Sequence, residues 1–555
     1  MAEPNFSILD VRREERFPTL TPAEVQRLRR FGEPRAFAEG EALTKVGETG
    51  HGLTLIVSGA VAVTQRDQLG HIRPIVTYGT GSFMGELGQL TGSPALTAAQ
   101  ALSPVETVII PPERLRALLV AEAELGERIM RALILRRVAL LELPGAGPII
   151  IGRPASRDVL RLESFLGRNA YPQQTLDPET DAEARALIER FHIEPDALPI
   201  VLCPGGELLR NPAEGQLARC LGMVGPIDAS KLYDVAIVGA GPAGMAAAVY
   251  AASEGLSVLN LDCRAFGGQA GASSRIENYL GFPTGITGMA LMARAHNQAL
   301  KFGVEVAIPD QVNAVTATAE GFGLSLADGE TARARSLVIA SGARYRRPDV
   351  ADLDKFEGSA VHYWASPLEG RLCADQEVAL VGGGNSAGQA IVFLATQARK
   401  VWVIVRAKGL EASMSSYLID RIRGLANVEL VFQSQVVDLQ GADGALETIA
   451  WRNLATGEEK RKSVPHLFLF IGADPNTDWL KGSGLQLDAK GFVVTGADAG
   501  DGRHPMETSL CGAFAIGDVR SGSVKRVAAA VGEGAQVVAA LHAYLPAAHP
   551  VAPGT

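Results

Sequence analysis

Two segments with the same strand–glycine–helix order constrain the fold of this chain more than any other feature. In the first, an apolar run at 234–238 leads into a glycine-rich turn, a helix of small residues at 245–254 and a second apolar run at 257–261. A Gly-x-Gly-x-x-Gly turn in this setting, with an acid at the end of the second strand, is the fingerprint of a dinucleotide-binding βαβ unit. Its candidate ligand-binding residues are Gly239, Gly241, Pro242, Ala243, Gly244 and the acid Asp262.

The second segment repeats this order about 140 residues later, beginning with an apolar run at 377–381. A helix to residue 396 and a strand at 400–405 follow, and Arg406 stands where the first segment has its acid. A basic residue at this place accommodates the 2′-phosphate of NADP, so NADPH is preferred and NADH stays possible. The candidate residues of this second site are Gly382, Gly384, Asn385, Ser386 and Arg406.

A competing interpretation exists for the same stretch, because residues 384–388 also fit the Gly-x-Ser-x-Gly turn of hydrolases. A hydrolase needs an acid and a histidine further along the chain, and His466, His504 and His542 are available. We disfavour this alternative because it leaves the first glycine fingerprint unexplained.

Composition sets the outer limits of the prediction. A chain of 555 residues should hold three or four domains, and a formal charge of −9 argues against a nucleic-acid partner. We expect no signal peptide and no membrane span, since Lys525, Arg526 and Glu533 interrupt the most apolar stretch, 524–545. The five cysteines show no Cys-x-x-Cys pair, which predicts a reducing cytoplasm, no disulfide framework and no metal site.

Residues 1–143 combine a helix starting at Thr21-Pro22 with short β-rich runs between 41 and 110, typical of a β jelly roll with flanking helices. The runs at 40–41, 52–59 and 83–87 resemble a cyclic nucleotide-binding domain. The resemblance makes Gly85, Glu86 and Leu87 the candidate ligand residues. The family's phosphate-binding arginine is missing after Pro94, which is followed by Ala95-Leu96-Thr97. We therefore expect a structural domain, or one that binds a cyclic nucleotide weakly or another small ligand.

Residues 148–222 read as a small α/β unit, with helices expected at 158–167, 182–191 and 211–221. The Leu198-Pro199-Ile200 segment resembles the proline-strand element of a thioredoxin or glutaredoxin fold. The redox dithiol of that fold follows the first strand, where this chain has residues 153–158 and no cysteine. We therefore expect a redox-silent module that docks or spaces the other domains.

The region 231–545 resembles the low-molecular-weight thioredoxin reductases through the segments 267–269, 276–279, 340–343, 471–477 and 512–518. The resemblance implies an FAD-binding domain at 231–348 and 471–546, a NAD(P)H-binding domain at 349–470, and a homodimer. The whole chain is thus expected to be multidomain, with a jelly roll, a thioredoxin-like module and two Rossmann-like α/β domains. The further FAD residues that the resemblance implies are Gly268, Gln269, Asn278, Ala340, Gly342, Gly517, Asp518, Lys525, Arg526 and Val527.

The chain departs from this family at its redox centre. The family has a Cys-Ala-Thr-Cys segment at the start of the nicotinamide domain, and here Trp364 and Pro367 stand at the two cysteine positions. We expect Cys263, Cys373 and Cys511 to be small hydrophobes without a redox role. The leading hypothesis is therefore an FAD-dependent NAD(P)H oxidoreductase that passes electrons directly to a ferredoxin-like carrier, a quinone or a small disulfide. The alternatives are a flavin-containing ligand or redox sensor, and a thioredoxin reductase that uses an unrecognised thiol.

Overall fold

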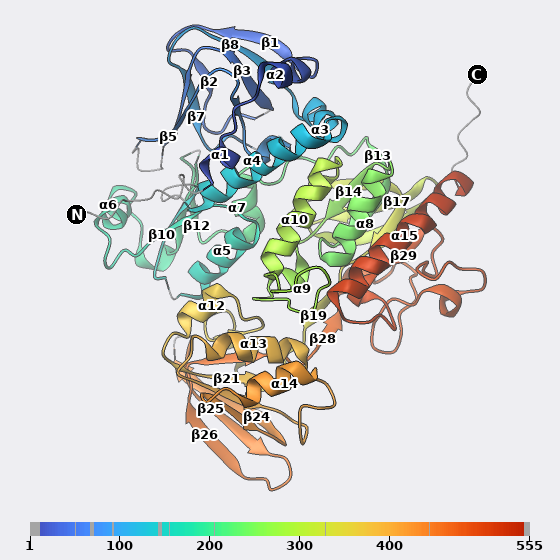
Figure 1. Cartoon of the computed structure of the whole chain (residues 1–555). Coiled ribbons are helices and arrows are strands. Elements are labelled where there is room, and N and C mark those ends of the chain that lie inside the picture. The colour runs from blue at the N-terminus through green and yellow to red at the C-terminus, as the bar shows by residue number, and fades with distance from the viewer. Residues whose placement is uncertain are drawn as a thin grey trace.

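The computed structural model describes residues 12–49, 52–66, 72–90, 94–142, 147–154, 156–204, 206–327, 329–442 and 444–548. Figure 1 shows β-rich N-terminal sheets at one end, a small α/β unit beside them, and two larger α/β units that complete the molecule. The first predicted domain break, at 144–148, lies largely outside the described residues. In the described chain no helix is long and apolar enough to cross a membrane.

The N-terminal part contains two four-stranded antiparallel sheets with helices packed at one end. Their core holds leucines, valines and aromatic side chains such as Leu53, Leu55 and Phe83, which are fully buried. One sheet has the order β1 (Glu33–Phe37), β8 (Val105–Ile110), β3 (Leu53–Ser58), β6 (Phe83–Met84), and the other β2 (Ala42–Thr44), β7 (Ala98–Ala101), β4 (Val61–Arg66), β5 (Ile72–Tyr78). The helices are α1 (Arg13–Arg16), α2 (Pro22–Arg29), the 3-10 turn η1 (Leu87–Leu90), α3 (Pro112–Ala121) and α4 (Ala123–Glu142).

Helix α2 begins where the sequence predicts. Thr21 is its N-cap and accepts a hydrogen bond from the backbone N–H of Glu24, whose carboxylate in turn accepts the Thr21 N–H. This reciprocal pair, followed by Pro22 at the first helical position, satisfies two otherwise unpaired backbone donors.

The second unit has a mixed four-stranded sheet of order β10-β9-β11-β12, in which β11 runs antiparallel to both neighbours. Its strands are β9 (Ile149–Ile151), β10 (Gln174–Leu176), β11 (Ile200–Leu202) and β12 (Leu208–Arg210). The predicted helices are present as α5 (Arg157–Arg168), α6 (Ala182–Arg190) and α7 (Glu214–Cys220). The peptide bond Leu198-Pro199 before β11 is cis, and the loop after β9 packs on Pro199 at Gly152.

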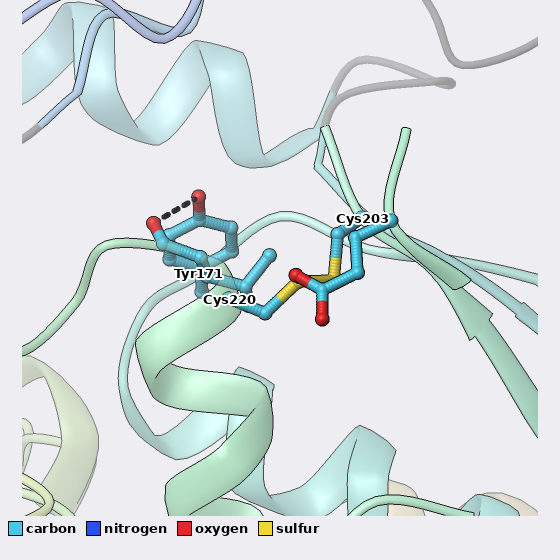
Figure 2. The surroundings of a disulfide bond; sticks show 5 residues. Tyr171, Cys203 and Cys220 are labelled. Carbon is cyan, nitrogen blue, oxygen red and sulfur yellow. Dashed lines mark hydrogen bonds between the residues drawn. A yellow bond between two sulfur atoms is a disulfide. The ribbon is translucent and has the colours of Figure 1, made fainter. Parts of the chain in front are cut away.

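A disulfide in this unit corrects the prediction that the cysteines form no bridge. Cys203 follows β11 and Cys220 ends α7, and their sulfur atoms are bonded across a Cα–Cα separation of 6.5 Å. Figure 2 shows the bond joining strand and helix, with Tyr171 beside Cys220. The two cysteines are 17 residues apart and share no motif, so only the packing of α7 on the sheet brings them together.

The third unit is built on a seven-stranded sheet whose centre is parallel, with β13 between β14 and β18. Helix α8 follows β13 and packs closely on α15, where a side chain at Gly534 would collide with the backbone of Ala243. The strands are β13 (Leu232–Val238), β14 (Val258–Leu261), β15 (Glu305–Ala307), β16 (Val312–Thr318), β17 (Gly321–Leu326), β18 (Thr331–Ile339) and β29 (Ala513–Ala515). The helices are α8 (Pro242–Ser253), α9 (Gly268–Gly271), α10 (Gly288–Lys301) and α15 (Val527–Ala548).

The fourth unit is a parallel five-stranded sheet of order β20-β27-β21-β22-β23 beside a three-stranded antiparallel sheet. Its parallel strands are β20 (Val361–His362), β21 (Glu377–Val381), β22 (Lys400–Ile404), β23 (Val428–Val431) and β27 (His466–Leu469), and the antiparallel ones β24 (Ser434–Ala442), β25 (Ala445–Asn453) and β26 (Glu459–Ser463). The helices are α11 (Leu353–Phe356), α12 (Pro367–Leu372), α13 (Asn385–Ala395) and α14 (Ser416–Arg423).

The chain passes between the third and fourth units twice, and the two crossings lie side by side. Strand β19 (Ala343–Tyr345) leaves the third unit and pairs antiparallel with β28 (Ala473–Pro475), which returns to it. The fourth unit is therefore an insertion in the third, held by a two-stranded connection.

Candidate functional site: a dinucleotide cavity between two Rossmann-like units

A cavity of about 290 Å3 lies where the third and fourth units face each other, and both units line it. It opens beyond the carboxyl ends of β13 and β18, the edge of a parallel sheet where ligands bind. The cavity brings together fourteen of the predicted cofactor residues: Gly241, Pro242, Ala243, Asp262, Gly268, Gln269, Ala340, Gly342, Gly517, Asp518, Lys525, Arg526, Val527 and Ser386.

The first glycine fingerprint forms the floor of this cavity. Gly239 has φ of +116°, and a Cβ there would lie 2.1 Å from the carbonyl oxygen of Ala340, so only glycine fits. Gly244 packs against Gly239 within the turn. Gly241 and Gly268 face each other, and side chains at these two positions would fill the space between them. The bare backbone at the start of α8 suits the pyrophosphate of a dinucleotide such as FAD.

Asp262 ends β14 beside this turn. One of its carboxylate oxygens accepts the N–H of Ala240 at 2.9 Å, and the other accepts those of Arg264 at 3.0 Å and Ala265 at 3.3 Å. Burial raises the pKa of Asp262, and these three N–H donors oppose that shift. The carboxylate is therefore fixed in orientation and still has lone pairs for a ribose hydroxyl.

Asp518 lies on the opposite wall, in the turn before α15. Glu533 of α15 fixes this turn, because its carboxylate accepts the N–H of Gly517 at 2.5 Å and a hydrogen bond from Arg520 at 2.5 Å. Burial raises the pKa of Asp518, while the nearby Lys525 lowers it. Asp518 and Lys525 thus give this wall both an acceptor and a donor for a polar chain such as the ribityl group of FAD.

The second unit of the fold contributes to the cofactor region, a role that sequence reasoning missed. Arg168 at the end of α5 donates from Nη2 to the carbonyl oxygen of Gly268 at 2.8 Å, and Asn169 donates to that of Arg264 at 3.0 Å. Arg264 also pairs with Glu214 of α7 at 3.1 Å. The small α/β unit is thereby attached to the backbone of the cofactor cradle.

Not every predicted residue reaches the cavity. Gly382 and Gly384 shape the second glycine turn, Asn385 accepts the N–H of Ser415 at 2.7 Å, and Asn278 and Arg406 are exposed. Of the second fingerprint only Ser386 lines the cavity, together with the neighbouring Gln389, Ala390 and Phe470. Sequence reasoning missed these neighbours, although Gln389 and Ala390 lie one helical turn beyond Ser386.

The histidines do not support the hydrolase alternative. His466 is paired with His362 at 3.1 Å within the fourth unit, His504 accepts the N–H of Met506, and His542 pairs with Glu254. None of the three lines the cavity that contains Ser386. Among the described residues no group of three His, Cys, Asp or Glu side chains could hold a metal ion.

At the place of the family's redox centre, the cavity wall holds aromatic and small side chains. Trp364 and Ala365 line the cavity, and Pro367 is the first residue of α12. The indole Nε1 of Trp364 donates to Glu369 at 3.0 Å, and its ring lies 6.3 Å from that of Tyr345. The cavity lining contains no cysteine.

The three free cysteines differ in their exposure. Cys373 is buried, and burial raises the pKa of its thiol to about 12, so it is a poor nucleophile. Cys263 and Cys511 are exposed.

A second, smaller cavity of about 80 Å3 lies in the N-terminal part. Of the three predicted ligand residues, Gly85 and Glu86 line it and Leu87, which begins η1, does not. Glu86 is buried and lies 3.7 Å from Arg137 of α4. Sequence reasoning missed another lining residue, the buried Arg136.

Comparisons with known proteins agree with this architecture. Residues 233–534 match the family described as pyridine nucleotide-disulphide oxidoreductase, and residues 34–122 match the cyclic nucleotide-binding domain. A thioredoxin reductase of Mycoplasmopsis pulmonis is 33% identical over 306 residues, which are 55% of this chain and 95% of that protein.

Solved structures give the same assignment. The thioredoxin reductase of T. acidophilum has 30% sequence identity and a TM-score of 0.52, covering 56% of this chain and 98% of that one. That of Lactococcus lactis has 28% identity and a TM-score of 0.52, over 56% and 99% of the two chains. Flavoproteins of this kind use FAD and NADPH, and the glycine turn, Asp262 and Asp518 at the cavity fit a dinucleotide such as FAD. The chain therefore belongs to the pyridine nucleotide-disulphide oxidoreductase family, as a thioredoxin reductase-like NAD(P)H-dependent flavoprotein with a cyclic nucleotide-binding domain at its N-terminal end.

Proposed function

We propose that this flavoprotein passes two electrons from NAD(P)H through FAD directly to an acceptor, without a protein dithiol beside the flavin. FAD supplies the hydride-accepting ring when bound. The balance is complete without sulfur. With an acceptor such as a quinone, NAD(P)H and one proton are consumed, NAD(P)+ is released, and the acceptor gains two electrons and two protons. With a one-electron carrier used twice, NAD(P)H gives up two electrons, and NAD(P)+ and one proton are released.

The observation that carries this proposal is the composition of the cavity wall at Trp364 and Ala365. Transfer from a flavin to a disulfide needs a sulfur atom beside the ring, and no lining residue has a thiol. Trp364 is fixed by its hydrogen bond to Glu369, within the capping box that starts α12. The wall is therefore a stable, sulfur-free surface.

The disulfide Cys203–Cys220 is the specific observation in favour of the rival, a thioredoxin reductase that uses an unrecognised thiol. The contacts of α7 argue against that role. Glu214, at the first turn of α7, pairs with Arg264 of the FAD-binding unit. Cys220 lies at the other end of the helix, about 9 Å further along its axis. We therefore assign this disulfide a structural role.

The proposal also includes the cofactor of each domain, the folds of the two N-terminal units and the state of assembly. We assign FAD to residues 231–348 and 471–546 and the nicotinamide dinucleotide to 349–470, with Asn278 reaching FAD when it is bound. The sheet order of residues 148–222 and the cis proline before β11 support a thioredoxin-like fold without its dithiol, and the N-terminal sheets support a jelly roll. A cytoplasmic homodimer completes the proposal.

The exposed guanidinium of Arg406, at the end of β22, supports NADPH over NADH. The test is anaerobic mixing of the purified holoprotein with each nucleotide while the flavin absorbance is followed. We expect both nucleotides to bleach the flavin, and NADPH to do so faster. In Arg406→Ser the preference for NADPH over NADH should fall about tenfold, because one charged contact is lost. Arg399→Ser, at the start of the same strand, is the matched control. A flavin that bleaches with neither nucleotide overturns the proposed function.

The acceptor is tested on the reduced protein with three kinds of oxidant: a quinone, a ferredoxin and a small disulfide. We expect reoxidation by the quinone or the ferredoxin in the variant Cys203→Ser/Cys220→Ser at the rate of the unmodified protein. Reoxidation by the disulfide alone, abolished in that variant, identifies the rival.

A further inference from the structure

The N-terminal cavity contains a buried cation that has no anionic partner among the side chains that the structure describes. Arg136 of α4 is 5% exposed and lines the cavity. Its Nε donates to the carbonyl oxygen of Arg16 at 2.9 Å, and its Nη1 to those of Phe83 at 3.0 Å and Gly85 at 2.9 Å. Nη2 is buried and has no hydrogen-bond partner.

This arrangement is costly for the protein alone. A buried donor without a partner costs about 1–3 kcal/mol, and more when the group is charged. Buried charges are otherwise paired with an opposite charge, yet the hydrogen-bond partners of Arg136 are neutral carbonyls. The rings of Phe17, Tyr78 and Phe83 lie against its guanidinium and stabilise the cation, but they supply no negative charge. The nearest carboxylate of the cavity, Glu86, forms its ion pair with Arg137 instead. The missing counter-charge of Arg136 is therefore one that a ligand can supply.

The rest of the cavity limits the chemistry of such a ligand. Much of the wall is apolar and includes Val63, Ile75, Val76, Met84 and Leu140. The volume of about 80 Å3 is well below the roughly 300–1,000 Å3 of sites that take drug-sized molecules. The space therefore suits a compact molecule with an apolar body, rather than a nucleoside with its base and sugar.

The charge of the lining favours an anion with one negative charge, such as a carboxylate, over a doubly charged phosphate monoester. A cyclic phosphodiester also carries one charge, and it is the small volume of the cavity that disfavours it. Two arginines, Arg16 and Arg136, and one carboxylate, Glu86, line the cavity and leave one net positive charge, and Nη2 of Arg136 is the nitrogen without a hydrogen-bond partner. A dianion would leave its second charge uncompensated and would face the carboxylate of Glu86 in the same cavity. The phosphate-binding arginine of the cyclic nucleotide-binding family is also missing from this chain, since residues 88–101 contain no basic residue.

We infer that the N-terminal cavity is a binding site for a small carboxylate with an apolar body, held by Nη2 of Arg136 from α4. The carboxylate replaces the cyclic phosphate as the anion of the domain, and the arginine that binds it comes from the helix after the sheets. This inference concerns a separate site, so it does not depend on the proposed electron transfer.

The position of Arg136 also connects the site to the rest of the chain. The adjacent Arg137 donates to the carbonyl oxygen of Ala170 at 3.3 Å, and its guanidinium lies over the Tyr171 ring at 5.5 Å. Ala170 directly follows Arg168 and Asn169, which hold the backbone of the FAD cradle. Figure 1 shows α4 running from the N-terminal sheets toward the small α/β unit. Binding at Arg136 therefore acts on a helix that contacts the support of the flavin site.

The experiment is isothermal titration of the full-length holoprotein with sodium hexanoate, benzoate, inorganic phosphate and cyclic AMP. We expect one carboxylate to bind per chain, with cyclic AMP and phosphate at least tenfold weaker. In Arg136→Gln we expect the affinity for the carboxylate to fall about 10- to 100-fold, as for the loss of a charge-assisted hydrogen bond. Arg131→Gln changes an exposed arginine five residues earlier in α4; it is the matched control and should keep full affinity.

A second variant keeps the test decisive if Arg136→Gln does not fold. Ala99→Leu adds bulk to the cavity wall and leaves Arg136 in place, so it should also reduce carboxylate binding while FAD content and the circular dichroism spectrum stay unchanged. The inference is overturned if neither carboxylate binds at millimolar concentration, if Arg136→Gln or Ala99→Leu folds and binds it as tightly as the unmodified protein, or if cyclic AMP binds most tightly.

Discussion

The indole Nε1 of Trp364 donates a 3.0 Å hydrogen bond to Oε1 of Glu369, which places an aromatic ring on the cavity wall at the position where the family resemblance predicts a cysteine. Glu369 is buried, and its other oxygen accepts the N–H of Ser366 at 2.9 Å as part of the cap of α12. Burial raises the pKa of Glu369, and these hydrogen bonds oppose the shift. The carboxylate of Glu369 thus caps α12 and also holds the Trp364 ring at the cavity wall, whose lining residues contain no sulfur.

Placing two cysteines at this wall should allow the flavin to reduce a protein disulfide. The variant Trp364→Cys/Pro367→Cys recreates Cys-Ala-Ser-Cys at the start of α12, where a helix N-terminus lowers the pKa of a thiol. We expect it to accept about four electrons per FAD, against about two for the unmodified protein, and to reduce a small disulfide. The control Trp364→Ser/Pro367→Ser opens the same space without sulfur and should stay at two.

The contact between Arg168 and Gly268 should hold FAD through the small α/β unit. In Arg168→Met we expect the attachment of this unit to lose about 1.5–3 kcal/mol, the range for a hydrogen bond from a charged group. FAD should then dissociate faster on dilution, as measured by the recovery of flavin fluorescence. Arg153→Met removes an exposed pair of the same unit with Glu179 and should leave FAD retention unchanged. Equal loss of FAD in both variants would contradict this role for Arg168.

The disulfide predicts a thiol count. Protein unfolded without reductant should show three reactive thiols, from Cys263, Cys373 and Cys511, and five after reduction. The variant Cys203→Ser/Cys220→Ser should show three in both conditions. Its free energy of unfolding should also fall by about 3 kcal/mol, because the disulfide joins cysteines 17 residues apart and so restricts the unfolded chain. If all five cysteines react with an alkylating agent added at cell lysis, without reductant, that result would contradict the disulfide.

The paired histidines of the fourth unit should make stability fall in mild acid. Burial lowers the pKa of His362 to about 3 and that of His466 to about 4, below the unfolded value of about 6.5. The unfolded chain therefore binds more protons below pH 6.5, and unfolding becomes easier as the pH falls toward 4. At pH 5 the two histidines should lower the free energy of unfolding by roughly 2–4 kcal/mol relative to pH 7.

Thermal unfolding at pH 7 and pH 5 measures this effect. In His362→Phe we expect about half of the pH-dependent loss, since one titrating group is removed and the ring can still pack on Phe468. His542→Gln, which removes a histidine of α15 that pairs with Glu254, should keep the pH dependence of the unmodified fourth unit. A His362→Phe variant with undiminished pH dependence would contradict the assignment.

Local sequence patterns predicted the elements of the fold well. Strand β21 has the predicted bounds, Glu377–Val381, and α13 ends one residue before the predicted Thr396. These segments combine apolar strands, glycine turns and small-residue helices, and all of that information is local in the chain. Of the fourteen predicted residues that line the cavity, five come from these local fingerprints, and the other nine come from the family resemblance.

Residues that depend on packing between distant segments could not be predicted. Cys203 and Cys220 meet only when α7 lies on β11, and Arg168 reaches Gly268 across 100 residues of sequence. Arg136 belongs to no motif, and its burial in the cavity follows from the docking of α4 on the N-terminal sheets. Asn278 stays a prediction, because the family resemblance places it at the flavin and the structure shows it exposed, outside the lining of the cavity.

The most direct test of the account is an anaerobic titration of the purified holoprotein with NADPH, in which the flavin absorbance gives the number of electrons taken up. The account predicts an end point at one NADPH, or two electrons, per FAD, unchanged in Cys203→Ser/Cys220→Ser. An end point at two NADPH per FAD that falls to one in this variant would contradict it, because a disulfide of the chain would then share electrons with the flavin.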